Sequence, residues 1–286
     1  MKSLTEANVL FLTGKHKEAL DAYLCLARDE HDETAAMNAG YMFHRGIGAM
    51  RDYHKAMECY VAASMAEGGA ACYNMAILYL RGQGVPVDFA KAIELMQRAA
   101  QLGSNDAKLY LGMAYILGCA YDPVEIECLS LIPFCRVIYR DVSVPLLAGE
   151  GFDPDLEDKR YEVIEADGEE AVAAYESIRP SDDSPRAAGI RLLMLGKAAI
   201  EGLGGEFNPA DGYRKLYSAA VNYQSAEAAQ YLLANADIAK TYRIDLGRLE
   251  LLSSHGYFRP ITGNLGTPRS HRVPLLIPDE SNPISI

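Results

Sequence analysis

Two glycine-rich strings are the residues of this sequence that most resemble a phosphate-binding loop. They are Gly46-Ile47-Gly48 and Gly82-Gln83-Gly84. A dinucleotide-binding loop must follow a β-strand and open a helix, so that backbone N–H groups at the helix N-terminus hold the pyrophosphate. Here each string follows one helical pattern and precedes another. We therefore interpret the glycines as helix ends and turns, and we expect no cofactor.

The histidines and cysteines could supply metal ligands, but their spacing does not form a site. Among the six histidines, only His54 has a second type of ligand one helical turn away, at Glu58. Zinc needs three or four protein ligands and groups that orient them. C-x-x-C spacing is typical of such ligands in a sequence. That spacing does not occur among the cysteines, which are Cys25, Cys59, Cys72, Cys119, Cys128 and Cys135. We therefore predict that no metal is bound.

An acidic segment carries most of the charge. Between Glu150 and Asp183 there are 13 acidic residues and three basic ones, and the whole chain of 286 residues has a net charge of −12. Proteins that bind nucleic acid normally present a basic stripe to the phosphates, and none is visible here. We therefore expect no nucleic-acid partner. The acidic segment is interpreted either as a solvated surface or as a region that attracts a protein partner with a basic surface.

The composition is that of an ordinary globular protein, since 50% of the residues are apolar and 23% are charged. No apolar segment approaches the roughly 18 to 20 residues of a membrane span. The first residues, Met1 to Leu12, lack the basic start and the long apolar run of a signal peptide. We therefore expect a cytoplasmic protein with free thiols.

The elements that hold these residues repeat along the chain. Gly46-Ile47-Gly48, Asp52 and Lys55-Ala56 recur 36 residues later as Gly82-Gln83-Gly84, Asp88 and Lys91-Ala92. Within each unit, apolar residues recur at the spacing of two amphipathic helices, one before the glycines and one after them. A period of this length predicts stacked units that cannot bury their apolar faces alone. The sequence therefore predicts an all-α fold, an α/α solenoid of antiparallel helical hairpins.

The residues between the two helices have the chemistry of a turn. Gly82 suits a left-handed cap at the end of the first helix, and Gly84 lets the chain reverse. Pro86 cannot continue the first helix, and Asp88 can cap the second one. The glycines in both strings are therefore predicted to be structural.

One unit carries a family signature, Ala71-x-x-x-Met75-Ala76-x-x-Tyr79-x-x-Gly82-x-Gly84-Val85-x-x-Asp88-x-x-Lys91-Ala92, ending Arg98-Ala99-Ala100-x-x-Gly103. This string resembles the Sel-one-like repeat (SLR), a relative of the tetratricopeptide repeat (TPR). The resemblance covers residues 70–103 and 35–68. It departs from the family where Cys59 and Leu95 replace a tryptophan common in the second helix. Because SLR proteins are commonly adaptors in signalling and assembly complexes, the resemblance implies a protein that binds other proteins.

The remaining segments complete the predicted organisation. Residues 1–33 form a TPR-like N-terminal hairpin, residues 34–140 hold SLR repeats, residues 141–185 are an acidic insertion, residues 186–240 hold a diverged SLR repeat and a C-terminal helix, and residues 241–286 are an extended Pro/Gly-rich tail. Residues 124–139 are expected to be the second helix of a third repeat, because Cys128 and Cys135 lie 36 residues after Ala92 and Ala99. One helix is expected around 156–177 and another over 226–240.

A cysteine nucleophile could meet a histidine in space whatever their spacing. Cys59, Cys128 and Cys135, however, fall at repeat positions that we expect to be buried, and buried structural cysteines are inert. We therefore assign no catalytic residue.

The partner-binding surface is predicted on the outward positions of the first helices, which line the concave wall of such solenoids. These residues are Asn38, Tyr41, Arg45, Asn74, Ile77, Arg81, Tyr110, Met113 and Leu117. Tyrosine and arginine are favoured at binding hot spots, and methionine adapts to varied partners.

Three functional interpretations follow. The first is a non-enzymatic protein-protein interaction module, either an adaptor or an inhibitor of the immunity type. The second is an enzyme whose site lies in the insertion and the tail, with the repeats as a scaffold that recruits the substrate. The third is a structural component that self-associates through its ends. Co-purification of a stoichiometric protein would favour the first interpretation over the second.

Overall fold

The computed structural model describes residues 3–64, 68–120, 163–178, 185–205 and 207–258, together with residue 159. All of the regular secondary structure in these ranges is α-helical, as predicted, and no strand occurs among them. The chain divides into two compact units, and the boundary lies between Ser104 and Asn105.

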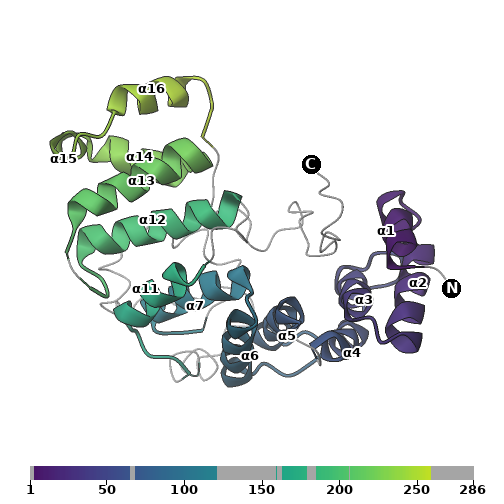
Figure 1. Cartoon of the computed structure of the whole chain (residues 1–286). Coiled ribbons are helices and arrows are strands. Elements are labelled where there is room, and N and C mark those ends of the chain that lie inside the picture. The colour runs from purple at the N-terminus through teal and green to yellow at the C-terminus, as the bar shows by residue number, and fades with distance from the viewer. Residues whose placement is uncertain are drawn as a thin grey trace, which may run out of the picture. The chain divides into compact units, whose positions relative to one another are not determined.

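Unit 1 consists of three helical hairpins (Figure 1). Its helices are α1 (Leu4–Leu12), α2 (His16–Asp29), α3 (Glu33–Arg45), α4 (Tyr53–Ser64), α5 (Gly69–Arg81) and α6 (Phe89–Gln101). α1 packs on α2, α3 on α4 and α5 on α6, and the hairpins stack because α2 also contacts α3 and α4 contacts α5. Wholly buried alanines such as Ala19, Ala56 and Ala92 let the helices approach closely. The predicted TPR-like first hairpin and the next two repeats are thus helical hairpins, as expected.

The predicted turn chemistry is confirmed in both glycine-rich loops. Gly46 and Gly82 end α3 and α5 in the left-handed conformation, with φ of 70° and 63°. The side chains of Asp52 and Asp88 accept hydrogen bonds from backbone N–H groups in the first turns of α4 and α6, at 3.0 and 2.8 Å. Each loop therefore contains two glycines at positive φ, Gly46 and Gly48 or Gly82 and Gly84, and ends in one side-chain cap.

We expect Gly82→Val to lower the free energy of unfolding by about 1 to 2 kcal/mol, because a β-branched residue is strained at positive φ. A Cβ on Gly82 would also lie 2.8 Å from Val87 Cγ2. Gly46→Val should behave in the same way. The matched control is Gly205→Val, since nothing lies within 4 Å of a Cβ at Gly205. Urea unfolding curves followed by circular dichroism would contradict the loop geometry if all three variants matched the wild type.

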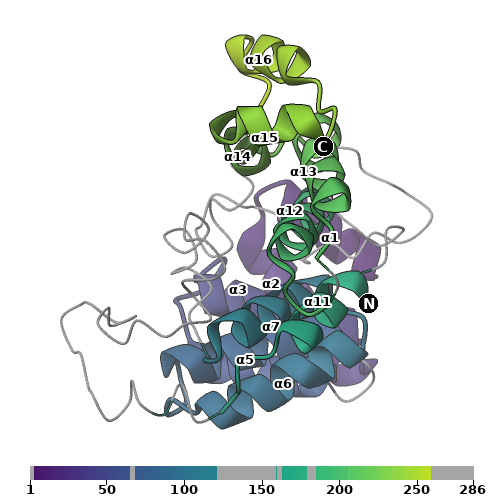
Figure 2. The same cartoon turned by 90° about the vertical axis from the view of Figure 1, so that its left-hand side faces the viewer.

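Unit 2 begins with a repeat whose two helices are far apart in the sequence. α7 (Asn105–Leu117) packs against α11 (Gly168–Glu176) (Figures 1 and 2). The loop ends match those of the second and third hairpins of unit 1, since Gly118 has a φ of 63° and the N–H of Asp167 donates to the carbonyl of Tyr115 at 2.9 Å. Asp167 then caps α11, accepting from Glu169 and Glu170. α11 is therefore the second helix of the third repeat.

This pairing corrects the expected position of the insertion. Six positions separate Gly46 from Asp52, whereas 49 separate Gly118 from Asp167, so 43 extra residues enter the loop inside the third repeat. The helix that packs against α7 is α11, whereas the sequence placed the second helix of this repeat at residues 124–139. Residues 124–139 themselves lie outside the described ranges. The helix expected around 156–177 begins at Gly168 and belongs to the repeat rather than to the insertion.

In two of these hairpins a glycine on the first helix packs against a tyrosine ring on the second helix. A Cβ on Gly40 of α3 would lie 2.7 Å from the ring of Tyr60 on α4. A Cβ on Gly112 of α7 would lie 2.6 Å from the ring of Tyr175 on α11. Both tyrosines lie eight residues after the capping aspartate and are buried. The hairpin of α7 and α11 therefore reproduces the packing of the hairpin of α3 and α4.

The rest of unit 2 continues the helical pattern. Its helices are α12 (Pro185–Glu201), α13 (Pro209–Tyr223), α14 (Ala226–Ala234), α15 (Ala236–Thr241) and α16 (Leu246–Ser254). α12 and α13 form a hairpin, with Gly202 and Gly204 at positive φ between them as the repeat predicts. The helix expected over 226–240 is broken at Asn235 into α14 and α15. Within the tail expected from residue 241, α16 packs against α14 and ends at Ser254 (Figure 2), and residues 259–286 lie outside the described ranges.

Candidate functional site

The first helices of the repeats carry the nine residues that the sequence predicts for partner binding. α3 and α5 of unit 1 hold six of them, and α7 of unit 2 holds the other three. Six are half-buried and keep exposed surface: Tyr41, Arg45, Asn74, Arg81, Met113 and Leu117. Asn38, Ile77 and Tyr110 are 0%, 7% and 3% exposed and do not face outward as expected. Contact of the other six with a partner stays a prediction.

The burial of Asn38 follows from the packing of α3 on α2. Its side chain lies beside the hydroxyl of Tyr23, without the geometry of a hydrogen bond. That hydroxyl donates instead to Oδ1 of Asn8 on α1, at 2.6 Å. Burial raises the pKa of Tyr23 to about 12, and the neighbouring Asn38 amide lowers it slightly. The position therefore contributes to contacts between hairpins rather than to an open surface.

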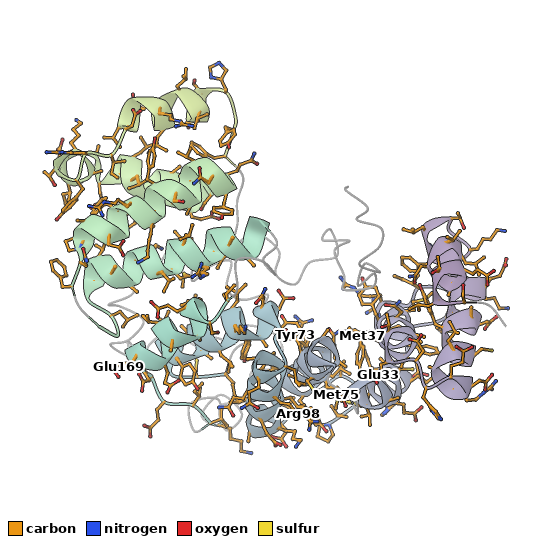
Figure 3. All side chains as sticks on the ribbon, in the orientation of Figure 1. Glu33, Met37, Tyr73, Met75, Arg98 and Glu169 are labelled. Atoms are coloured by element: carbon orange, nitrogen blue, oxygen red, sulfur yellow. The ribbon has the colours of Figure 1, made fainter. Side chains whose placement is uncertain are left out.

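The exposed part of the α3 and α5 face is ordered by contacts within and between repeats. Arg45 Nε donates to the Tyr41 hydroxyl at 3.2 Å, and the guanidinium carbon lies 5.7 Å from the centre of the Tyr41 ring. Asn74 Nδ2 lies 3.8 Å from the sulfur of Met37, so α5 meets α3 at this point. Figure 3 shows the side chains on these helices, with Met37 and Tyr73 labelled. The face thus combines aromatic, cationic, amide and thioether groups in fixed positions.

Sequence reasoning missed a group around His44, in the last turn of α3. The His44 ring lies 5.5 Å from the Tyr53 ring and 6.2 Å from the Tyr60 ring, and its Nδ1 is 3.3 Å from the Tyr60 hydroxyl. Burial, together with the charges of Arg45, Arg81 and Arg51, lowers the pKa of His44 to about 4, and the Gln83 side chain acts in the opposite direction. His44 is therefore a neutral imidazole at neutral pH. In the sequence, the feature that could have indicated this group is the pair Arg45 and Arg81, which lie 36 residues apart at equivalent repeat positions.

The α7 face of unit 2 is more apolar. Met113 packs against the buried cluster that includes Tyr175 and Ile178. Lys108 is buried, and its ammonium donates to the carbonyl of Ser177 at 2.9 Å, so it ties α7 to the end of α11. On α11 the exposed carboxylates of Glu169 and Glu170 lie in the first turn, where the helix dipole favours negative charge. Figure 3 labels Glu169 on this helix. The acidic residues of the segment from Glu150 to Glu162 lie outside the described ranges.

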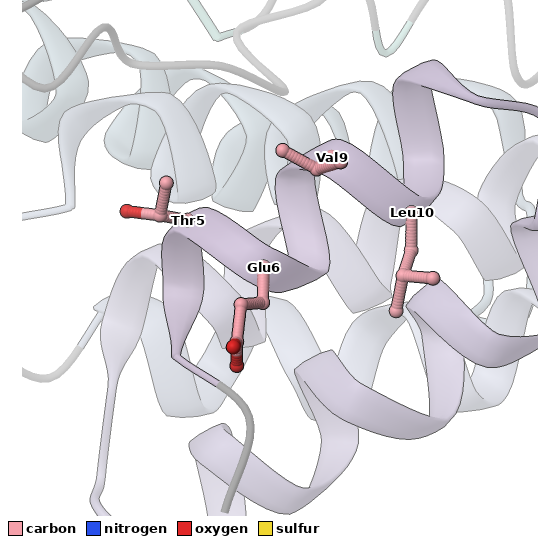
Figure 4. A pocket seen from close by; sticks show the side chains of 4 residues that line it. All are labelled: Thr5, Glu6, Val9 and Leu10. Carbon is pink, nitrogen blue, oxygen red and sulfur yellow. The ribbon is translucent and has the colours of Figure 1, made fainter.

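A pocket of about 370 Å³ lies on the outer helix of unit 1 (Figure 4). It is lined by Thr5, Glu6, Val9 and Leu10 of α1. Val9 is 52% exposed, and Leu12 on the same helix is 49% exposed. This is an apolar surface at the beginning of the solenoid, and it bears no group of the kind that catalysis requires except the Glu6 carboxylate, which closes the capping box of α1 with Ser3.

The described cysteines are free thiols with different exposure. Cys72 and Cys119 are buried, Cys59 is half-buried and Cys25 is exposed. Burial raises the pKa of the Cys59 thiol to about 11, with the charge of Glu58 adding to the shift, and this is opposite to the thiolate that a nucleophile needs. Cys128 and Cys135 lie outside the described ranges.

The described residues hold neither a cluster of metal-ligating side chains nor a helix suited to a membrane span. Within them, no group of three or more histidine, cysteine, aspartate or glutamate side chains could hold a metal ion. His54 and Glu58 are both exposed on α4 and lie outside any such group. None of the helices in the described ranges combines the length and the apolar character needed to cross a membrane.

Two solved structures of repeat proteins are similar to this chain. Among solved structures, a Sel1 repeat protein from Oxalobacter formigenes matches 77% of this chain and 49% of its own, with 19% sequence identity and a TM-score of 0.54. A protective antigen present in uropathogenic Escherichia coli strains, which displays an SLR fold, matches 82% of this chain and 52% of its own, with 16% identity and a TM-score of 0.38. The chain thus spans about half the length of these structures.

A comparison with curated proteins found no match. The Sel1 repeat, by contrast, is matched twice in succession, by residues 34–67 and 69–104. The first stretch contains α3 and α4, and the second contains α5 and α6. Residues 34–104, which hold both hairpins and both glycine-rich loops, are therefore similar to the Sel1 repeat family.

Proposed function

We propose that this chain is a non-enzymatic binding protein that holds a protein partner on the first-helix face of its Sel1 repeats, centred on Tyr41, Arg45 and Arg81. The observation that carries the proposal is the ordered pair of Tyr41 and Arg45 on an exposed helix face within a matched Sel1 repeat. Proteins built from Sel1 repeats generally serve as scaffolds for protein interactions. Tyrosine and arginine are also the residues that most often carry binding energy at interfaces.

Rigidity of this face supports the same function. Arg45 is held by the Tyr41 hydroxyl and ring, and the helix below it is fixed by Gly40 against Tyr60. A side chain that is ordered before binding loses less conformational entropy when the partner arrives. A folded partner that presents complementary polar groups would therefore meet a surface that needs little rearrangement.

Two finer roles fit this function, an adaptor that joins two proteins and an inhibitor that blocks one. The acidic segment favours a partner that also has a basic surface, because a clustered negative field accelerates encounter with such a protein. Glu169, Glu170 and Glu176 are the acidic residues of that segment that lie exposed on α11. These roles differ in whether the captured protein keeps its own activity when it is bound.

The experiment replaces Tyr41, Arg45 and Arg81 by alanine in the full-length chain and measures binding to the protein that the wild type captures from the native lysate. Truncation of a hot-spot residue typically costs 2 kcal/mol or more, about a thirtyfold loss of affinity, whereas a surface residue elsewhere changes binding by about 0.5 kcal/mol or less. We therefore expect at least a thirtyfold loss for the triple variant, measured by calorimetry with the purified partner. The control is Arg98→Ala, which removes an exposed arginine from the last turn of α6.

Two outcomes would count against the proposal. Capture of the same partner in equal yield by the triple variant would place the binding surface elsewhere. A wild-type chain that captures no protein but converts a small molecule would favour the enzyme interpretation instead. Thermal melts of all variants should agree within a few degrees, which shows that lost binding does not come from unfolding.

A further inference from the structure

The outer side of α1 is apolar, although this helix lies at the beginning of the described solenoid. Thr5, Val9 and Leu12 occupy the i, i+4 and i+7 positions of one helical stripe, and Val9 and Leu12 are 52% and 49% exposed. Thr5 and Val9 line the pocket of about 370 Å³ and project to the same side in Figure 4. On the inner side, Leu10 and Phe11 pack against the buried core of unit 1. α1 is therefore apolar on both sides, a pattern typical of a helix that is covered on both sides.

The stacking of the hairpins leaves this outer side of α1 without a described neighbour. α3 lies between α4 and α2 of the preceding hairpin, and α5 lies between α6 and α4. α1 contacts α2, and the exposure of Val9 and Leu12 shows that no helix among the described residues covers its other side. Solenoids normally end in a polar outer face, because their solubility requires it. We therefore expect a further segment to cover α1.

The chain itself contains an apolar segment of suitable length after α16. The run Val273-Pro274-Leu275-Leu276-Ile277-Pro278 belongs to residues 259–286, which lie outside the described ranges. Its two prolines are incompatible with the interior of a helix and favour an extended chain. Six residues of such a chain span roughly 19 Å, whereas α1, with nine residues, is about 14 Å long. The run is therefore long enough to cover α1 from end to end.

Charges at the two ends of this run complement those around α1. Arg272 precedes the run and Asp279 follows it. Glu6 lies near the N-terminal end of α1, Lys15 lies just beyond its C-terminal end, and both are exposed. In the part of the chain that the structure describes, Lys15 forms no ion pair. A run that lies parallel to α1 therefore brings Arg272 to the Glu6 end and Asp279 to the Lys15 end.

The length of the connecting chain favours the same molecule as the source of this segment. Val273 follows Phe258, the last described residue, by 15 positions. An extended chain of 15 residues spans at most about 50 Å, more than the roughly 30 Å diameter of a small domain. Tethering also gives the segment a high effective concentration. A second copy is a poorer source, because two chains that each carry a net charge of −12 repel one another.

We infer that the outer side of α1 is a docking site for the segment Val273–Pro278 of the same chain, which covers Val9 and Leu12 and completes this end of the solenoid. Docking removes an apolar helix face and an apolar run from water together, which is the driving force for the contact. The inference goes beyond the proposed function and does not rest on it, because the proposed partner-binding residues lie on α3 and α5.

The first test uses tryptophan fluorescence of the full-length chain, because the sequence contains no tryptophan. We expect the indole of Leu276→Trp to emit at a shorter wavelength than that of Ser270→Trp, which lies outside the apolar run. Adding Val9→Asp to Leu276→Trp should shift the emission to that of an indole in water. The matched control is Val61→Asp, which changes a 43% exposed valine on α4 and should leave the emission unshifted.

The second test adds a fluorescein-labelled peptide of residues 268–282 to a full-length chain in which Leu275, Leu276 and Ile277 are replaced by aspartate. We expect this variant to bind the peptide in fluorescence anisotropy, and the wild type, whose α1 is occupied, to bind it at least tenfold more weakly. Val9→Asp in the same variant should weaken the peptide at least tenfold, the usual effect of losing a buried valine. Glu6→Gln keeps the capping box but removes the charge, and should weaken the peptide up to about fivefold.

Three results would overturn the inference. The first is emission of Leu276→Trp that does not respond to Val9→Asp. The second is a peptide that binds equally well with and without Val9→Asp. The third is a short-wavelength emission that is lost on dilution together with a dimer in analytical ultracentrifugation, because a second copy would then cover α1. Circular dichroism spectra of all variants should match that of the wild type, which shows that the helices are intact.

Discussion

Replacing Tyr175 by alanine is expected to lower the free energy of unfolding by about 3 to 5 kcal/mol, the usual loss for a large aromatic side chain removed from a core. Tyr175 is 2% exposed, and its ring lies against Gly112 of α7, from which it is separated by the insertion. The measurement is urea unfolding followed by circular dichroism. Glu176→Ala, an exposed change on the same helix, is the control and should alter the free energy by no more than about 0.5 kcal/mol.

The partner position allows a sharper form of this test. Gly112→Ala should destabilise by about 1 to 3 kcal/mol, because a Cβ there would overlap the Tyr175 ring in a core without spare volume. The second repeat has Ala76 and Met96 at the corresponding positions, and both are wholly buried. The double variant Gly112→Ala with Tyr175→Met should therefore be more stable than the sum of the two single changes. Strict additivity, or a harmless Tyr175→Ala, would show that α11 is not the second helix of the third repeat.

Acidification is expected to remove about 2 to 3 kcal/mol of stability through His44, because its pKa falls from the ordinary 6.5 to about 4 on folding. Burial and the charges of Arg45, Arg81 and Arg51 disfavour the imidazolium. The unfolded chain therefore binds the proton more readily than the folded chain between pH 6.5 and about 4. This contribution to stability is complete above pH 6.5 and is lost as the pH falls toward 4.

The measurement compares the wild type with His44→Gln in urea at about pH 7.5 and at about pH 4. Carboxylates that titrate in this range contribute equally to both proteins, so the difference between the two isolates His44. We expect the wild type to lose about 2 to 3 kcal/mol more than the variant on acidification. Equal losses would mean that His44 is more hydrated than the structure shows, and would also weaken the case for a concentrated positive charge around it.

The hairpins and their loops could be predicted because their determinants are local. Gly46 and Gly82 need only the positive φ that glycine adopts freely, and Asp52 and Asp88 need only backbone N–H groups three residues ahead. A 36-residue period then repeats this local chemistry. The same reasoning failed for residues 124–139, because it assumed that the second helix follows the first at the usual distance.

The sequence also held a signal for the true partner of α7. Tyr175 follows Asp167 by eight residues, as Tyr60 follows Asp52, but a spacing of this kind is weak evidence until the two helices are seen in contact.

In the candidate site, Tyr41, Arg45 and Arg81 were found by counting helix positions. Asn38, Ile77 and Tyr110 satisfied the same count, yet they are buried. Counting helix positions predicts which residues share one face of a helix. Whether those residues are exposed depends on how the neighbouring hairpin covers that face.

The sequence by itself determined that residues 34–104 form two helical hairpins, because capping and helical periodicity act within a few residues of the chain. The tertiary structure alone decided that α7 pairs with α11 and that His44 lies against the rings of Tyr53 and Tyr60. The reason is that helix pairing depends on complementary surfaces, such as Gly112 opposite Tyr175, and not on distance along the chain. The 43 inserted residues lengthen the loop between α7 and α11. Because the entropic cost of closing a loop grows only slowly with its length, the two helices still pair.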